Sequence, residues 1–268
     1  MRTIALVAGA VFRESVRDRV PYSMVLFAVL LMAASYLISQ LTAGQDLKII
    51  KDLGLAAIAI FGLLIAVFIG IGLVSKEVER KSVYGLLTKP VTRTEFILGK
   101  YAGLVLTLAV NIAAMAVALY AVLYYMNVTA SESARAGWLV PATDPRLLIA
   151  IVLIFAELAV ITAVALLFST FSSPLLAALY TLGLWVAGHF NADLRNFENV
   201  IDAPVAIWIA KAMYYVLPNL QPFDVKAEVV HGLPVGARHV GLTLAYAAVY
   251  GGLLLTAALA IFRRRDFK

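Results

Sequence analysis

The sequence of 268 residues contains no cysteine and little charge. Without a thiol the chain forms no disulfide, no thiolate metal site and no cysteine nucleophile. Charged residues make up 14% of the chain and hydrophobic residues 63%, whereas roughly a quarter of a soluble domain is charged. Most of the apolar surface must therefore face lipid or other buried helices, as in an integral membrane protein.

Motifs for common enzyme chemistry are also missing. A phosphate-binding loop requires G-x-x-x-x-G-K-[ST], but Gly99-Lys100 is followed by Tyr101, and Thr94 stands where the first glycine would lie. The chain therefore cannot act as its own ATPase through such a loop. There is no H-E-x-x-H and no G-x-S-x-G sequence. We expect no catalytic residue and no enzyme activity, and the length leaves no room for a separate soluble catalytic domain.

Six apolar runs are candidates for membrane-spanning helices, each of which needs about 20 mostly apolar residues. They are Tyr22–Leu41, Leu53–Val74, Tyr101–Met126, Leu147–Phe168, Leu175–Phe190 and Val240–Phe262. The fifth run is short and follows Pro174. A further stretch, Ala203–Leu217, contains Lys211 and stops at Pro218, so we expect an interfacial or re-entrant helix there. The fold class is an all-α integral membrane domain over residues 1–268.

The first 20 residues form a different kind of helix. Apolar residues recur there at helical spacing, at Ile4, Val7, Ala8, Val11, Phe12 and Val16. Arginines occupy other positions, at Arg2, Arg13, Arg17 and Arg19. This pattern predicts an amphipathic helix lying along the membrane surface.

The distribution of basic residues predicts the orientation of the chain. With a cytoplasmic N-terminus, residues 1–21, 75–100, 169–174 and 263–268 lie inside and hold 14 of the 22 basic residues. The outer segments hold the other eight, together with nine acidic residues. The positive-inside rule therefore places both termini in the cytoplasm. Topology accounts for the formal charge of +6, so nucleic acid is not an expected partner.

The cytoplasmic segment 75–100 is the most informative part of the sequence. Pro90 ends any preceding helix, and Thr92 with Glu95 has the spacing of a capping box. We expect a separate short helix over 93–99 at the membrane face, and its mixed charge suits either a solvated loop or the docking of a partner. Gly99 and Gly103 lie four residues apart, which predicts close packing of the third span on a neighbour.

This segment resembles the ABC-2 type transporter permease family, especially permeases of the NosY group. The similar features are the charged cluster Glu77–Lys81, the pair Leu86-Leu87, the turn Pro90-Val91-Thr92-Arg93, Glu95–Ile97 and the end Leu98-Gly99-Lys100. The six-span layout, the amphipathic start and the basic tail Arg263-Arg264-Arg265 also resemble this family.

The resemblance implies the membrane subunit of an ATP-driven exporter with a type V, ABCG-like fold, in a bacterial or archaeal cytoplasmic (inner) membrane. Residues 92–99 then look like a coupling helix for a separate ATPase subunit, which would carry ATP and Mg²⁺, and residues 1–20 like a connecting helix. A second permease subunit, identical or closely related, would complete the path. The expected docking residues are Glu77, Glu79, Arg80, Pro90, Arg93, Glu95, Phe96, Gly99 and Lys100.

Two polar residues lie deep within the predicted spans. Glu157 is near the middle of the fourth span and Asn111 is at similar depth in the third. Because a lone charged acid is costly there, we expect a hydrogen bond between the two side chains. Glu157 is either a functional group, such as a gate, substrate contact or proton-coupled site, or a link between helices.

The outer segment 191–239 is expected to be the largest extracytoplasmic loop, with aromatic residues at the interface and, by the resemblance, a lid over the path. His189, His231 and His239 are expected at or beyond the outer face as ordinary histidines, with no metal. An ion-coupled secondary transporter is the alternative function, although the sequence shows no internal repeat of the kind common there. A membrane enzyme would need converging polar residues, and an importer permease a different loop that begins Glu-Ala-Ala.

Overall fold

The computed structural model describes residues 2–39, 46–79, 92–138, 140–191, 207–208, 211–214 and 217–264. All the regular secondary structure assigned in these ranges is helical. The elements are α1 Arg2–Arg17, α2 Arg19–Ser39, α3 Asp46–Glu79, α5 Arg93–Thr129, α6 Glu132–Ala136, α7 Arg146–Ser169, α8 Pro174–His189, the 3-10 helix η2 Gln221–Phe223, α11 Lys226–Val230 and α12 Ala237–Arg264.

Five helices are long and apolar enough to cross a membrane, namely α2, α3, α5, α7 and α12. They coincide with five of the six predicted spans, so the protein is an all-α, multi-pass membrane protein. The remaining predicted span corresponds to α8, which is apolar but has 16 residues. A helix of that length rises about 24 Å, less than the ~30 Å hydrocarbon core of a bilayer. Thus α8 by itself is shorter than the hydrocarbon core.

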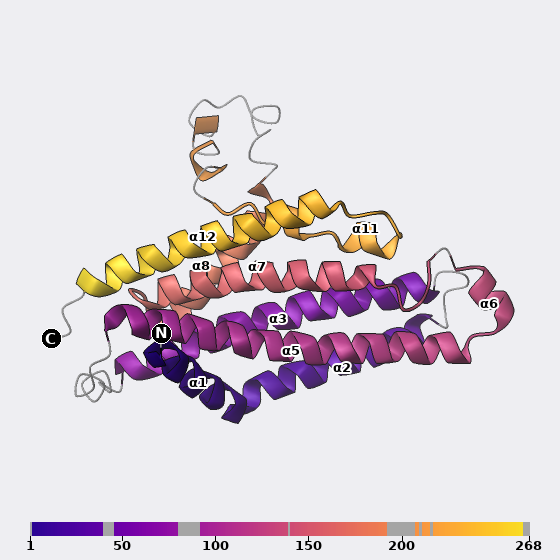
Figure 1. The fold of residues 1–268 in the computed structure, drawn as a ribbon, viewed down its shortest axis with the longest axis horizontal. Coiled ribbons are helices and arrows are strands. Elements are labelled where there is room, and N and C mark those ends of the chain that lie inside the picture. Colours follow the sequence, from indigo (N-terminus) through magenta and orange to yellow (C-terminus); the bar gives the residue numbers. More distant parts are fainter. Residues whose placement is uncertain are drawn as a thin grey trace.

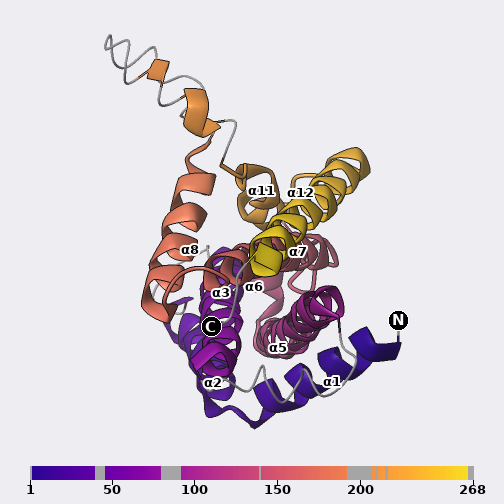
Figure 2. The ribbon, with the colours of Figure 1, turned by 90° about the vertical axis from the view of Figure 1, so that its left-hand side faces the viewer.

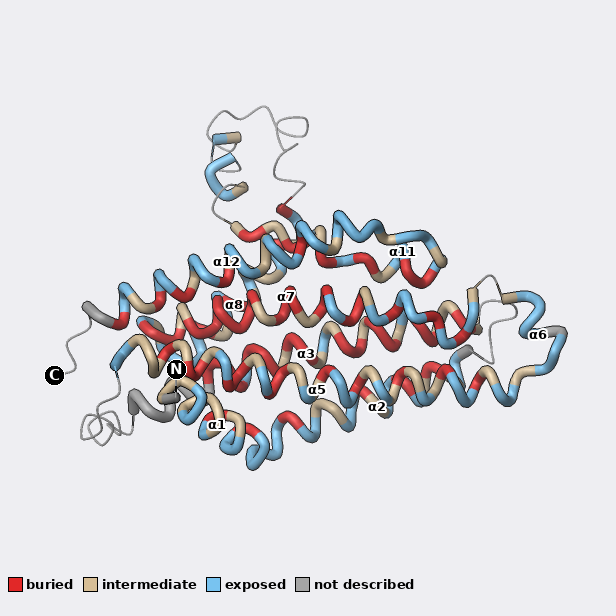
Figure 3. The backbone as a smooth tube through the Cα atoms, in the orientation of Figure 1, coloured by how far each residue is buried: buried red, intermediate tan, exposed pale blue. Residues whose placement is uncertain are grey.

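The long helices run side by side and place their ends at two opposite ends of the molecule. The start of α1 and the end of α12 lie at one end, and α6 lies at the other (Figure 1). We call these the N/C end and the α6 end. The core lies between the central helices α3 and α7, whereas α2 and α12 expose much of their apolar surface, as Figure 3 shows.

Glycines spaced eight residues apart let α3 approach its neighbours closely. A Cβ atom on Gly54 would meet Leu119 of α5, and a Cβ on Gly62 would meet Leu158 of α7. Small residues at such positions allow membrane helices to pack through van der Waals contact, since lipid gives no hydrophobic driving force between them. The central helix α3 is therefore fitted to α5 and α7.

The predicted amphipathic helix is confirmed as α1, and its inward side packs against α5 (Figure 2). A Cβ on Gly99 would lie 2.6 Å from Val7 Cβ, and one on Gly103 would lie 2.7 Å from the backbone oxygen of Ala8. The expected close packing at Gly99 and Gly103 is therefore confirmed, and the neighbour is α1. One side of α1 therefore packs on α5, and the opposite side faces outward.

The expectation of a separate helix over 93–99 is wrong, because α5 runs without interruption from Arg93 to Thr129. No proline occurs in this range, and Gly99 is held in the helix by the contact with α1, so nothing breaks the backbone. The predicted capping box is confirmed: the Glu95 N–H donates to the Thr92 hydroxyl at 3.2 Å, and the Thr92 N–H donates to Glu95 Oε2 at 3.1 Å.

The chain after α8 returns to the helical core. The Leu220 N–H donates to the Gly188 carbonyl at 3.0 Å, and Phe223 is fully buried. Helix α11 then packs against α3 and α7. Residues 217–230 are therefore packed segments rather than a free loop. Of the predicted interfacial helix over 203–217, the structure describes only 207–208, 211–214 and 217.

Candidate functional site

Those predicted docking residues whose side chains the structure describes lie at the N/C end. Four of the predicted residues, Glu77, Glu79, Arg80 and Pro90, fall where the structure describes no side chain. The other five, Arg93, Glu95, Phe96, Gly99 and Lys100, belong to the first two turns of α5. Their role in docking stays a prediction, but their contacts within the chain are defined.

The start of α5 is joined to the end of α12. Arg93 Nη1 donates to the Phe262 carbonyl at 3.2 Å, and the rings of Phe96 and Phe262 stack with centroids 6.1 Å apart. The Lys100 ammonium lies 4.7 Å from the centre of the Phe96 ring, and Lys100 is only 2% exposed. Gly99 and Lys100 therefore pack within the chain, whereas Arg93 stays exposed at the surface.

The last turns of α1 and the start of α2 present a second group of charged residues. They are exposed and include both signs: Arg13, Glu14, Arg17, Asp18 and Arg19. We call these five residues the α1 charged face. In the sequence these charges indicate topology, and none of them is among the predicted docking residues. The helical spacing of the nearby apolar residues could have identified these charges as a docking surface. If the apolar side faces α5, the charged side must face away from it.

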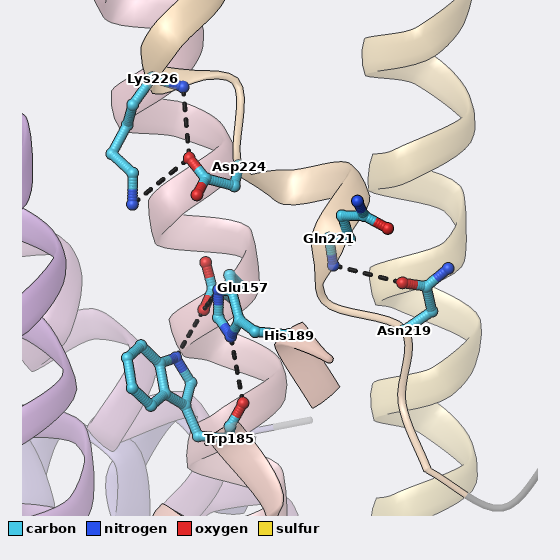
Figure 4. A network of polar contacts seen from close by, with 7 residues as sticks. All are labelled: Glu157, Trp185, His189, Asn219, Gln221, Asp224 and Lys226. Carbon is cyan, nitrogen blue, oxygen red and sulfur yellow. Dashed lines mark hydrogen bonds and ion pairs between the residues drawn. The ribbon is translucent and has the colours of Figure 1, made fainter. Parts of the chain in front are cut away.

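Glu157 is the central polar residue of the membrane core. It is 4% exposed and lies on α7. Its Oε1 atom accepts a hydrogen bond from Trp185 Nε1 at 2.7 Å and lies 3.5 Å from His189 Nε2, both on α8 (Figure 4). The expected bond between Asn111 and Glu157 is therefore wrong. Asn111 Nδ2 instead donates to the Thr107 carbonyl one turn earlier at 2.7 Å, a local bond that helices offer to short polar side chains.

The expectation that His189 lies at or beyond the outer face is also wrong, because α8 ends beside the middle of α7. Its Nδ1 atom contacts the Trp185 carbonyl at 3.1 Å. A second polar pair lies in the same region, where Lys226 Nζ and Asp224 Oδ1 are 3.4 Å apart (Figure 4). Where α8 ends was not visible from the sequence, so the pairing with Glu157 was missed.

The chain beyond α8 is anchored by Asn191, which is 1% exposed. Its Nδ2 atom donates to the Leu217 carbonyl at 2.9 Å and to the Tyr214 carbonyl at 3.3 Å. These bonds join the end of α8 to the chain just before the return segment over 217–230. These two hydrogen bonds hold the start of the return segment against the end of α8.

A buried lysine near the α6 end was not expected from the sequence. Lys51 is 1% exposed, and its Nζ donates to the Pro141 carbonyl at 2.8 Å. The nearby Asp144 is 4% exposed, and its backbone carbonyl accepts a bond of 3.0 Å from the Tyr120 hydroxyl. The apolar run that starts at Leu53 predicts Lys51 in an outer loop. The helical spacing of Leu47, Ile50 and Gly54 was the available signal that the helix begins earlier.

The described part of the chain contains no group of three or more His, Asp or Glu residues that could hold a metal ion. His231 and His239 each contact a backbone carbonyl, those of Ala227 and Pro222 respectively, at 2.8 Å.

The fold and the polar sites are those of a polytopic helical membrane protein whose long helices end in a charged surface on one side. Residues 5–195 match the model of the ABC-2 family transporter proteins. This match covers more than half of the chain, so the protein belongs to the ABC-2 transporter family and is a membrane component of transport. The match is to the family as a whole and does not single out the NosY group. No curated protein matches the sequence significantly.

Proposed function

We propose that the protein is the permease subunit of an ATP-driven exporter in the cytoplasmic membrane. Its helices form half of a translocation path, and a second copy or a close paralogue supplies the other half. A separate ATPase subunit docks at the N/C end, which faces the cytoplasm. Family membership supports this proposal, and the missing phosphate loop requires an external source of energy.

The observation that carries the proposal is the joining of three elements into one body at the N/C end. Gly99 and Gly103 of α5 hold α1 closely, and Arg93 and Phe96 hold the end of α12 through Phe262. A displacement at the α1 charged face would pass directly to the membrane helices α5 and α12, because packed elements move as rigid bodies. Such a linked surface suits a subunit driven by a partner.

The same surface supports the predicted site of docking. The exposed charges on α1 would set the register of the partner and speed its association, and apolar groups near them would contribute contact area. The basic balance of the segments at this end supports a cytoplasmic orientation through the positive-inside rule. The exposed apolar faces of α2 and α12 are then available to lipid and to the second permease subunit.

Exchanging charges on α1 tests the docking surface without changing net charge. The variant combines Glu14→Arg with Arg17→Glu, two exposed residues three apart on α1. We expect the tagged wild-type chain, gently solubilised, to co-purify with a phosphate-loop ATPase subunit, and the variant to lose most of it.

A matched control is available at the opposite end of the molecule. Glu132→Arg with Arg135→Glu makes the same exchange, also three residues apart, on α6, and should leave co-purification unchanged. The proposal fails if the wild-type chain captures no ATPase subunit, or if transport runs on an ion gradient without ATP. The second result would favour the ion-coupled secondary transporter.

A further inference from the structure

The Glu157 cluster places two titratable side chains together at the middle of the membrane. Glu157 is the twelfth of 24 residues in α7, which puts it roughly 17 Å from either end of the helix at 1.5 Å per residue. An uncompensated carboxylate at such depth costs several kcal/mol. Two side chains of α8 contact this carboxylate: the Trp185 indole donates a hydrogen bond to it, and the His189 ring lies beside it.

The hydrogen-bonding groups around His189 determine how many protons the cluster needs. The Nδ1 atom lies 3.1 Å from the Trp185 carbonyl; since a carbonyl oxygen only accepts, Nδ1 carries a proton. The Nε2 atom faces Glu157 Oε1 at 3.5 Å. In a neutral ring this Nε2 would present a lone pair to the oxygen lone pairs. One more proton, on Nε2 or on the carboxyl group, removes the repulsion.

Three features of the site favour that additional proton. His189 is in the last turn of α8, where the negative end of the helix dipole stabilises a cation. The Trp185 ring lies 4.7 Å from the His189 ring, centre to centre, and an indole attracts cations. The nearby carboxylate balances the imidazolium charge, so the protonated pair is neutral overall and can remain buried.

We propose that Glu157 and His189 form an intramembrane proton-binding site that holds one proton between α7 and α8. The proton comes from water and returns to water, and no other bond forms or breaks. Among the described residues, the other charged groups that act on Glu157 are Lys226 and Asp224. These two have opposite charges and pair with each other at 3.4 Å, so their effects on the site partly cancel.

Occupancy of the site is linked to the packing of α8 on α7. With the proton bound, the contact between the two side chains is an ion pair with no net charge. Without it, a buried carboxylate faces a lone pair, and the contact becomes repulsive. The packing of the end of α8 should therefore weaken as the pH rises. This makes the mid-membrane end of α8 sensitive to protons, whichever subunit powers transport.

Trp185 supplies a reporter within the site itself. The chain has three tryptophans, so Trp138→Phe with Trp208→Phe leaves Trp185 as the single fluorophore. In lipid nanodiscs, we expect its emission to rise in one transition of one-proton steepness as the pH increases, because an imidazolium quenches a neighbouring indole. His189→Gln should abolish the transition. Glu157→Gln should lower the proton affinity of the site at least about tenfold, since it removes the counter-charge.

Two controls separate this site from other titrating groups. His231→Gln changes an exposed histidine whose Nδ1 also contacts a carbonyl four residues earlier, and it should leave the transition unchanged. Asp224→Asn should shift it far less than Glu157→Gln does. If the emission of the single-tryptophan chain does not change with pH, the proposal is overturned, and no further variant is needed to show this. A transition that persists in folded His189→Gln, or is unmoved in folded Glu157→Gln, also overturns it.

Discussion

The carboxylate of Glu157 on α7 accepts a hydrogen bond of 2.7 Å from the indole nitrogen of Trp185 on α8. This bond joins the middle of a long buried helix to the last turn of a shorter one. Because α8 ends beside Glu157 instead of reaching the α6 end, the bond lies close to the end of that helix. The return segment begins nearby, where Leu220 bonds to Gly188.

Replacing Trp185 by phenylalanine tests the value of this bond. Trp185→Phe keeps an aromatic ring but removes the N–H donor, which leaves a buried carboxylate oxygen without that partner. We expect the variant to be less stable by about 1–3 kcal/mol, measured by denaturant unfolding in detergent micelles. Trp208→Phe is the control, since Trp208 is 72% exposed. Equal stability of the two variants would show that the bond contributes nothing.

The close packing of α1 on α5 predicts a strong effect of one added methyl group. In Gly103→Ala the new Cβ would lie 2.7 Å from the Ala8 carbonyl oxygen and from Val11 Cβ, so the helices must separate. We expect a loss of about 1–3 kcal/mol, with faster proteolysis within α1. Gly183→Ala is the matched control, because a Cβ added there would point into open space. Unchanged cleavage of α1 in Gly103→Ala would contradict this packing.

Lys51 is expected to anchor the chain before α7 to α3. Lys51→Met removes the bond to the Pro141 carbonyl and the positive charge near buried Asp144. We expect a loss of about 1–3 kcal/mol from the unpaired carbonyl, and faster hydrogen exchange in residues 140–145. Lys48→Met changes a less buried lysine one turn earlier and should have little effect. Equal exchange in the two variants would argue against an anchor.

The absence of cysteine allows the orientation to be measured with single introduced thiols. Asp18 and Glu132 are both exposed. Asp18 directly follows α1 and Glu132 begins α6, and these two helices lie toward opposite ends of the molecule (Figure 1). In intact cells, a maleimide that cannot cross the membrane should label Glu132→Cys, and should label Asp18→Cys only after the membrane is opened. The unchanged chain provides the blank, since it has no thiol. The reverse labelling pattern would place the N/C end outside.

Features that depend on local sequence were predictable. Apolar runs of about 20 residues gave five of the membrane helices, because length and composition decide whether a helix can span. The capping box of Thr92 and Glu95 was predictable because both partners lie within one turn. The spacing of Gly99 and Gly103 correctly indicated a close contact. It did not reveal that the neighbour is α1, which depends on how the helices are arranged.

Features that depend on tertiary structure were not predictable in the same way. The partner of Glu157 is set by the place where α8 ends, and that end is fixed by Asn191 and by the bond from Leu220 to Gly188. Asn111 instead donates a hydrogen bond to a carbonyl of its own helix, that of Thr107. Lys51 looked like a loop residue because a lysine rarely sits buried at a helix start, and its acceptor is 90 residues away.

The most direct measurement is ATP hydrolysis by the separate ATPase subunit in proteoliposomes, with and without this chain. We expect the chain to bind that subunit and to change its rate of hydrolysis. The exchange of Glu14 and Arg17 charges on α1 should abolish this effect, and the matched exchange of Glu132 and Arg135 charges on α6 should preserve it. Identical hydrolysis with and without the chain, together with no binding, would contradict a permease driven through its α1 and α5 surface.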